Sequence, residues 1–204
     1  MPVFFQHQIN DTTRLAIWKI EETEEYFKNN VPLHRDVTHP HKRLQHLAGR
    51  FLLQFLFADF PYELIQIADT HKPFLPDAQY QFSISHCADY AAVIVSRDSR
   101  VGIDIERPVD KLYRIRDRFL HPDEADALQV DDLEKLTTCW SVKEAVFKWY
   151  GEGGVDFKEN IRLLQWNVET QTIDCFFTKT NQNLLAHYRV FQGLVLVWIE
   201  GSGG

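Results

Sequence analysis

The sequence contains few cysteines, fewer basic than acidic residues, and no long apolar run. Its three cysteines, Cys87, Cys139 and Cys175, are too scattered for a disulfide framework, and no CxxC pair offers a zinc site. No apolar run could span a bilayer, and no signal pattern follows Met1. The formal net charge of -7 argues against non-specific binding to nucleic acid. We therefore expect a cytoplasmic protein without a membrane or nucleic-acid partner, whose cysteines are small buried hydrophobic residues.

The pattern of apolar residues indicates two comparable halves. With 204 residues, of which 45% are hydrophobic, the chain can bury a sizeable core. In the first half we expect strands over 14–20, 64–67, 79–84 and 91–95 and a helix over 41–57. In the second half we expect strands over 101–106, 161–166, 173–177, 187–191 and 194–199 and helices over 113–119 and 133–150. This pattern predicts an α+β protein with subdomains over 1–99 and 100–200 and a flexible tail over 201–204.

Two acidic residues lie close together in the segment Val101–Glu106. Apolar residues at positions 101, 103 and 105 alternate with Asp104 and Glu106, so a strand here would have one apolar face and one face with both carboxylates. Their mutual repulsion is costly unless a cation lies between them, and hard oxygen ligands suit Mg²⁺. The alternative is an ordinary half-buried strand with two solvated acids.

The predicted helix over 133–150 supplies further charged residues. Its apolar residues at 142, 145, 146 and 149 form one stripe, while Trp140, Glu144 and Lys148 fall on the opposite side. Together with the acidic strand, the helix provides a third carboxylate and the two lysines Lys143 and Lys148. This is the inventory of a Mg²⁺ site that holds a diphosphate. The alternative is a solvated Glu–Lys pair one helical turn apart.

Four short motifs follow one another along the chain. They are Lys72-Pro73-Phe74-Leu75-Pro76, Phe82-Ser83-Ile84-Ser85-His86, Gly102-Ile103-Asp104-Ile105-Glu106 and Trp140-Ser141-Val142-Lys143-Glu144-Ala145-Val146-Phe147-Lys148. In this order they resemble the motifs of the 4'-phosphopantetheinyl transferases, in the single-chain class that activates carrier proteins of synthetases and synthases. The resemblance implies two similar α+β subdomains in a pseudo-twofold arrangement, with coenzyme A at their seam. One departure is His71, which stands where the family commonly has a glycine suited to a positive-φ turn.

The resemblance also implies a reaction and roles for the residues. The reaction is Mg²⁺-dependent transfer of 4'-phosphopantetheine from coenzyme A to a serine of an apo acyl, peptidyl or aryl carrier protein, with release of 3',5'-ADP. Asp104, Glu106 and Glu144 would hold Mg²⁺. Asp104, Glu144 and Lys148 would be catalytic: Lys148 binds the α-phosphate, and Glu144 or a metal-bound water takes the serine proton.

Coenzyme A carries a diphosphate and a 3'-phosphate, which call for further cations. The resemblance assigns nucleotide contacts to Lys72, Pro73, Ser85 and His86, with Arg43, Arg50 and Lys148 as further cofactor-binding candidates. The histidines between His34 and His46 lack ligand spacing on one helix face, so we interpret them as a solvated approach to the helix, although His46 could reach a phosphate.

The partner surface is predicted just after the acidic strand. The stretch Lys111–Leu120 interleaves cations with apolar residues, and we expect Arg114, Arg116 and Arg118 to dock an acidic carrier protein. The alternative is a solvated helix edge. Two other functions remain open: a Mg²⁺-dependent hydrolase of a nucleotide or diphosphate, and a non-enzymatic α+β interaction domain. We expect a monomer, and the sequence does not specify the carrier or the pathway.

Overall fold

The chain forms two compact units in the computed structural model, Met1–Arg100 and Val101–Gly204. The structure describes residues 3–31, 37–191 and 193–201. The division after Arg100 is adjacent to the boundary expected from the sequence. Of the predicted tail over 201–204, only Gly201 belongs to the described residues.

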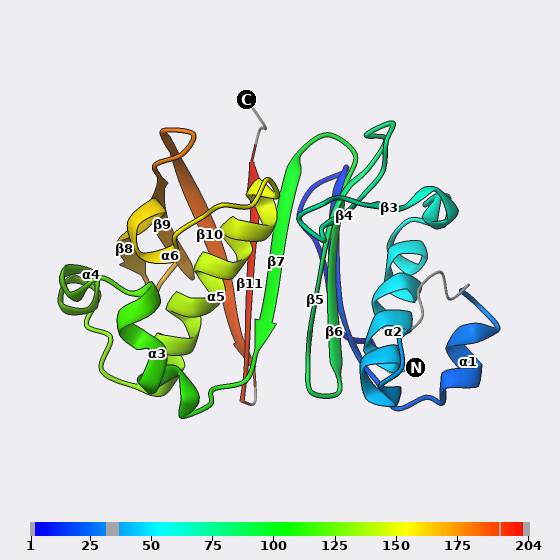
Figure 1. Cartoon of the computed structure of the whole chain (residues 1–204), viewed down its shortest axis with the longest axis horizontal. Coiled ribbons are helices and arrows are strands. Elements are labelled where there is room, and N and C mark those ends of the chain that lie inside the picture. The colour runs from blue at the N-terminus through cyan, green and yellow to red at the C-terminus, as the bar shows by residue number, and fades with distance from the viewer. Residues whose placement is uncertain (1–2, 32–36, 192, 202–204) are drawn as a thin grey trace. The chain divides into compact units, whose positions relative to one another are not determined.

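The first unit is built on a four-stranded antiparallel sheet with the strand order β1-β2-β6-β5. Its strands are β1 (Val3–Gln8), β2 (Thr13–Lys19), β5 (Gln81–Cys87) and β6 (Tyr90–Ser96). Between β2 and β5 lie α1 (Glu24–Lys28), α2 (Pro40–Leu56), the 3-10 turn η1 (Tyr62–Leu64) and the short paired strands β3 (Gln66–Ile67) and β4 (Pro73–Phe74). Pro40 is the first residue of α2, where its fixed φ suits a helix start. The long helix α2 packs on β6 and β2 through a buried apolar face (Figure 1).

The second unit contains a five-stranded sheet with the order β7-β11-β10-β9-β8. Its strands are β7 (Arg100–Glu106), β8 (Ile161–Asn167), β9 (Thr172–Phe177), β10 (Gln182–Phe191) and β11 (Leu194–Gly201). Its helices are α3 (Lys111–Phe119), α4 (Pro122–Ala127), α5 (Leu133–Tyr150) and α6 (Phe157–Asn160). The helix α5 packs on the sheet, mainly on β11, and α3 packs on α5 (Figure 1). Gly151 ends α5 in the left-handed conformation, with φ 77°.

The predicted α+β class is confirmed, and both long helices lie where the apolar periodicity places them. The short elements β1, α1, β4, α4 and α6 were not predicted. The strand predicted over 64–67 is partly wrong, because residues 62–64 form the turn η1 and only Gln66–Ile67 are extended. No helix in the described part of the chain is long and apolar enough to cross a membrane.

Two of the three cysteines are buried as expected. Burial raises the pKa of both the Cys139 and the Cys175 thiol to about 12, so neither is a reactive thiolate. Cys87 is only half-buried, and the expectation of a buried residue is wrong there because it lies at the end of β5.

Candidate active site

Strand β7 carries Asp104 into the interior of the second unit. Residues 101–105 are all buried, and Asp104 is only 2% exposed. The alternative of two solvated acids on a half-buried strand is therefore wrong for Asp104. Asp104 is buried because the helix α5 covers the face of β7 that carries Gly102 and Asp104.

The approach of β7 to α5 depends on Gly102. A Cβ atom at this position would lie 2.1 Å from the carbonyl oxygen of Ala145 and 2.8 Å from the backbone nitrogen of Trp149. Both atoms belong to the backbone of α5, which cannot rotate away. The missing side chain at Gly102 thus lets the strand lie against the helix, two residues before Asp104.

The helix α5 brings Glu144 and Lys148 to Asp104. Lys148 Nζ donates a hydrogen bond of 2.6 Å to Asp104 Oδ1, and the lysine side chain is 25% exposed. Burial raises the pKa of the half-buried Glu144 carboxyl, the charge on Lys148 opposes that shift, and the charge on Asp104 adds to it. The predicted catalytic residues Asp104, Glu144 and Lys148 therefore form one electrostatic cluster.

The carboxylates were also predicted to hold Mg²⁺. Glu106 lies at the end of β7, half-buried and on the same strand face as Asp104. Among the described residues, no three His, Cys, Asp or Glu side chains are grouped closely enough to hold a metal ion by themselves. Mg²⁺ usually takes only one or two protein carboxylates together with waters and substrate phosphates. A donor set of Asp104 and Glu144 suits that mode, and all three predicted ligands, Asp104, Glu106 and Glu144, stay predictions.

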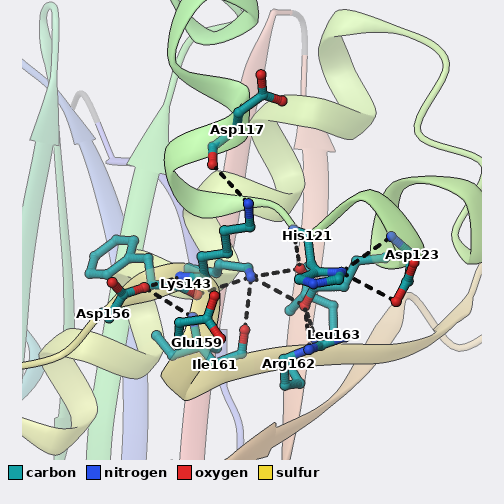
Figure 2. A network of polar contacts seen from close by, with 12 residues as sticks. Asp117, His121, Asp123, Lys143, Asp156, Glu159, Ile161, Arg162 and Leu163 are labelled. Atoms are coloured by element: carbon teal, nitrogen blue, oxygen red, sulfur yellow. Dashed lines mark hydrogen bonds and ion pairs between the residues drawn. The ribbon is translucent and has the colours of Figure 1, made fainter.

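Lys143 does not belong to this cluster, so its predicted place beside the diphosphate is wrong. It lies five residues before Lys148, which turns the two side chains about 140° apart around α5. Lys143 is fully buried, and its Nζ atom donates to both carboxylate oxygens of Glu124 at 3.2 and 3.0 Å. Burial lowers the pKa of Lys143, and Glu124 opposes that shift. Figure 2 shows Lys143 inside a network of polar contacts.

Sequence reasoning missed Glu124, although a local signal was present. His121 is the N-cap of α4, Pro122 is its first residue, and Glu124 closes a capping box by accepting from the backbone nitrogen of His121 at 2.7 Å. The residues His121-Pro122-Asp123-Glu124 could therefore have predicted the start of α4.

The first unit carries the predicted nucleotide contacts. Lys72 is half-buried before β4, Pro73 begins β4, and on β5 Ser85 is buried while the adjacent His86 is exposed. The backbone of His71 has φ 65°, so this position adopts the positive-φ turn expected of a glycine. Whether these residues bind a nucleotide stays a prediction.

Arg50 on α2 differs from the other predicted cations of this unit. It is 7% exposed, burial lowers its pKa to about 10, and its buried Nη1 atom has no hydrogen-bond partner in the described part of the chain. The helix meets β5 beside it, because a Cβ atom on Gly49 would lie 2.8 Å from Ile84 Cγ2. Arg50 thus directly follows the residue of α2 that lies against β5.

Arg43 and the histidines have other surroundings. Arg43 pairs with Glu24 Oε1 at 2.8 Å and donates to the backbone oxygen of Val37 at 2.7 Å. The ring of His41 lies 3.0 Å from the backbone oxygen of Ala88, in keeping with a packing role. His34 lies outside the described residues, and His46 is half-buried.

The predicted docking helix α3 exposes Arg114 and Arg118, whereas Arg116 is half-buried. A pocket of about 340 Å³ lies beside it, lined by Ile115, Arg118, Phe119, Trp140, Asp156 and Phe157. Trp140 packs between Phe119 and Phe157, with ring centroids 5.1 and 5.5 Å away, rather than on an open helix face as expected. The α3 surface thus combines cations with an apolar recess.

Comparisons with known proteins indicate the family that the sequence motifs resemble. A model of the 4'-phosphopantetheinyl transferase superfamily matches residues 100–196, which contain both β7 and α5. Enterobactin synthase component D of Escherichia coli (strain K12) is 27% identical over 165 residues, covering 76% of this chain and 75% of that protein. Enterobactin synthase component D of Salmonella typhi is 32% identical over 54% of this chain and 49% of that protein. A Xenopus laevis L-aminoadipate-semialdehyde dehydrogenase-phosphopantetheinyl transferase is 25% identical over 63% of this chain and 49% of that protein.

The chain is similar to the 4'-phosphopantetheinyl transferase superfamily, above all over residues 100–196. The predictions of this family and of an enzyme are thereby confirmed. The cluster on β7 and α5 lies within the residues that the family model matches.

Proposed function

We propose that this protein transfers 4'-phosphopantetheine from coenzyme A to a serine of an apo carrier protein in a Mg²⁺-dependent reaction. The observation that carries the proposal is the cluster of Asp104, Glu144 and Lys148 within the region matched by the family model. Similarity to proteins described as a phosphopantetheinyl transferase and as enterobactin synthase components supports the same activity.

In this reaction the serine oxygen forms a bond to the phosphorus next to pantetheine. The bond from that phosphorus to the bridging oxygen breaks, and 3',5'-ADP leaves with the electron pair. Either Glu144 or a water bound to the metal is the candidate base for the serine proton. Lys148, still partly exposed, offsets the negative charge on the departing diphosphate oxygen. A Mg²⁺ ion held by Asp104 and Glu144, with Glu106 as a further candidate, would neutralise diphosphate charge.

The test is the intact mass of apo acyl, peptidyl and aryl carrier proteins incubated with the enzyme, coenzyme A and Mg²⁺. We expect a mass increase of one phosphopantetheine group and an equal amount of 3',5'-ADP, both abolished by a chelator and restored by Mg²⁺. Cleavage of coenzyme A without any carrier would instead support the hydrolase alternative. Transfer that persists at full rate after chelation would contradict the role of Mg²⁺.

For the nucleotide end we propose Arg50 as a phosphate contact, together with Lys72, Pro73, Ser85 and His86. The buried Nη1 atom of Arg50 has no hydrogen-bond partner in the described part of the chain, which is costly, and an incoming phosphate oxygen would satisfy it. We expect Arg50→Met to weaken coenzyme A binding in calorimetry by about 10- to 100-fold, which corresponds to one or two charge-assisted hydrogen bonds. The same variant should melt at a higher temperature than the parent when no ligand is present.

Arg97→Met provides the matched control for Arg50. Arg97 lies in the same unit but is paired with Asp59 and stacked over Phe57 and Tyr80, so its loss should lower the melting temperature and leave coenzyme A binding unchanged. Unchanged coenzyme A affinity in Arg50→Met would remove Arg50 from the proposed nucleotide site.

For the partner we propose that an acidic carrier protein docks on α3. Reversing Arg114, Arg116 and Arg118 to glutamate should slow carrier modification at low salt by at least about tenfold and spare coenzyme A binding, because charges at an interface rim act mainly on association. Added salt should narrow the difference in modification rate between the parent and the variant. Salt screens charges over about 8–10 Å and so weakens the attraction between the three arginines and the acidic carrier, which the variant lacks.

Single variants give a matched comparison for the dock. Arg118→Glu reverses a cation that lines the apolar pocket beside α3. The control Lys179→Glu reverses an exposed cation in the turn between β9 and β10. Equal carrier kinetics in these two variants would show that α3 is only a solvated helix edge.

A further inference from the structure

Lys143 and Glu124 form a charged pair in the interior of the second unit. Their side chains are 0% and 2% exposed, and Lys143 Nζ also donates to the backbone oxygens of Phe157 at 3.0 Å and Ile161 at 2.8 Å. The three N–H groups of the ammonium therefore meet a carboxylate and two carbonyls. Figure 2 shows these contacts converging on Lys143 Nζ.

The carboxylate of Glu124 is equally well satisfied. Its Oε1 atom accepts from the backbone nitrogen of Leu163 at 2.6 Å, and its Oε2 atom accepts from the backbone nitrogen of His121 at 2.7 Å. The pair thus joins four elements: α4 through Glu124, α5 through Lys143, α6 through Phe157, and β8 through Ile161 and Leu163. Because both charged groups are buried and each makes several hydrogen bonds, the pair allows Lys143 little freedom to shift.

Lys143 is also the residue directly before Glu144. A rigid helix that is anchored at Lys143 on one side has its rotation fixed about its own axis. On the other side, the close approach of Gly102 to the backbone at Ala145 and Trp149 sets the distance from α5 to β7. Two contacts about 140° apart around α5 therefore determine where Glu144 and Lys148 lie relative to Asp104.

We propose that Lys143 is a positioning residue for phosphopantetheine transfer, and that it acts through the buried pair with Glu124 to hold α5 in the rotation that brings Glu144 and Lys148 to Asp104. The expected effect on kcat rests on the proposed function. The expected effect on the position of α5 relative to Asp104 rests on the geometry of the second unit alone. Lys143 itself touches no substrate in this scheme.

Stability alone is a poor explanation for a pair of this kind. Removing two charges from water is expensive, and well-packed apolar residues often replace a buried ion pair at no loss of stability. What the pair adds is directional: four short contacts from one ammonium specify one orientation of α5. An apolar side chain would fill the same space but would not fix the helix rotation in this way.

The test compares Lys143→Met and Glu124→Gln with the core variant Ile173→Ala, each at a temperature where circular dichroism shows a fully folded protein. Ile173 is a fully buried residue of the same core on β9 and contributes no polar contact to the pair. We expect kcat to fall about tenfold or more in both pair variants, because small displacements of catalytic groups are costly. The KM for coenzyme A should change by less than about threefold, and the kinetics of Ile173→Ala should match those of the parent.

A second readout does not depend on activity. The coupling between Asp104 and Lys148 is measured by a double-mutant cycle of unfolding free energies with Asp104→Asn, Lys148→Gln and both. We expect this coupling to be lost in the Glu124→Gln background and retained in the Ile173→Ala background. Glu124→Gln is isosteric and keeps an acceptor for Leu163, so it serves where Lys143→Met does not fold.

The outcomes separate the two ideas. If Glu124→Gln keeps both the Asp104–Lys148 coupling and the parental kcat, the pair is only structural and the inference is overturned. If the coupling is lost but the parent protein modifies no carrier, the proposed function fails while the positioning of α5 stands.

Discussion

Asp104→Asn is expected to lower the turnover of phosphopantetheine transfer by about 100- to 1,000-fold, the range seen when one electrostatic contact to a reacting group is removed. Asn keeps the shape of Asp104 but loses the charge that pairs with Lys148 and that adds to the effect of burial in raising the pKa of Glu144. The variant should therefore hold Lys148 less well, make Glu144 a weaker base, and lose a ligand for Mg²⁺. Turnover is measured at saturating coenzyme A and carrier protein, by intact mass against time.

Stability measurements keep this result interpretable. One charge-assisted hydrogen bond is lost, so the free energy of unfolding should fall by about 1–3 kcal/mol. Asp174→Asn is the matched control, because Asp174 is an exposed residue on β9 of the same unit. It makes the same chemical change and should leave turnover and stability near those of the parent. Near-normal turnover in Asp104→Asn would mean that Asp104 has no part in the reaction.

The two elements that carry the cluster were predictable because each has a strong local pattern. The alternation of apolar and acidic residues predicts β7, and an apolar stripe that ends at Gly151 predicts α5. The i, i+4 spacing of Glu144 and Lys148 also places both side chains on one side of α5. These are local properties, which a single sequence records.

The burial of Asp104 and the role of Lys143 were not predictable in the same way. Alternation shows which residues share a strand face, but it does not show that a helix covers the polar face as well. The approach of α5 depends on Gly102 meeting residues more than forty positions further along the chain. Likewise, Lys143 is buried because its partner Glu124 comes from another helix, and no periodicity within α5 reports a partner elsewhere.

The backbone conformation at His71 was also not predictable from its residue type. A turn without glycine is less able to adopt a positive φ, yet the backbone of His71 has φ 65°. Its backbone nitrogen donates to the oxygen of Ala68 at 2.8 Å, and the nitrogen of Ala68 donates to the oxygen of Lys72 at 2.9 Å. These bonds close the turn and offset the cost of the left-handed conformation, which is modest for histidine.

Gly102→Ala is expected to have the second large effect, on both stability and turnover. The new methyl group would overlap the carbonyl oxygen of Ala145 and crowd the backbone of Trp149, so β7 must move away from α5. Overpacking of this kind costs about 1–3 kcal/mol in the free energy of unfolding. Because Asp104 lies on the displaced strand, its contact with Lys148 should lengthen, and a shift of about 1 Å can lower turnover about 100-fold.

Gly201→Ala is the matched control for this variant, since it adds the same methyl group to another strand of the same sheet. A Cβ atom on Gly201 would meet only the indole nitrogen of Trp149, at an ordinary distance of 3.8 Å. This variant should keep the melting temperature and the turnover of the parent. In Gly102→Ala, the free energy of unfolding from urea titration and the rate of single-turnover transfer should both fall. The Asp104–Lys148 coupling energy should fall with them. A Gly102→Ala protein with parental stability and turnover would show that the close approach of β7 to α5 does not position the cluster.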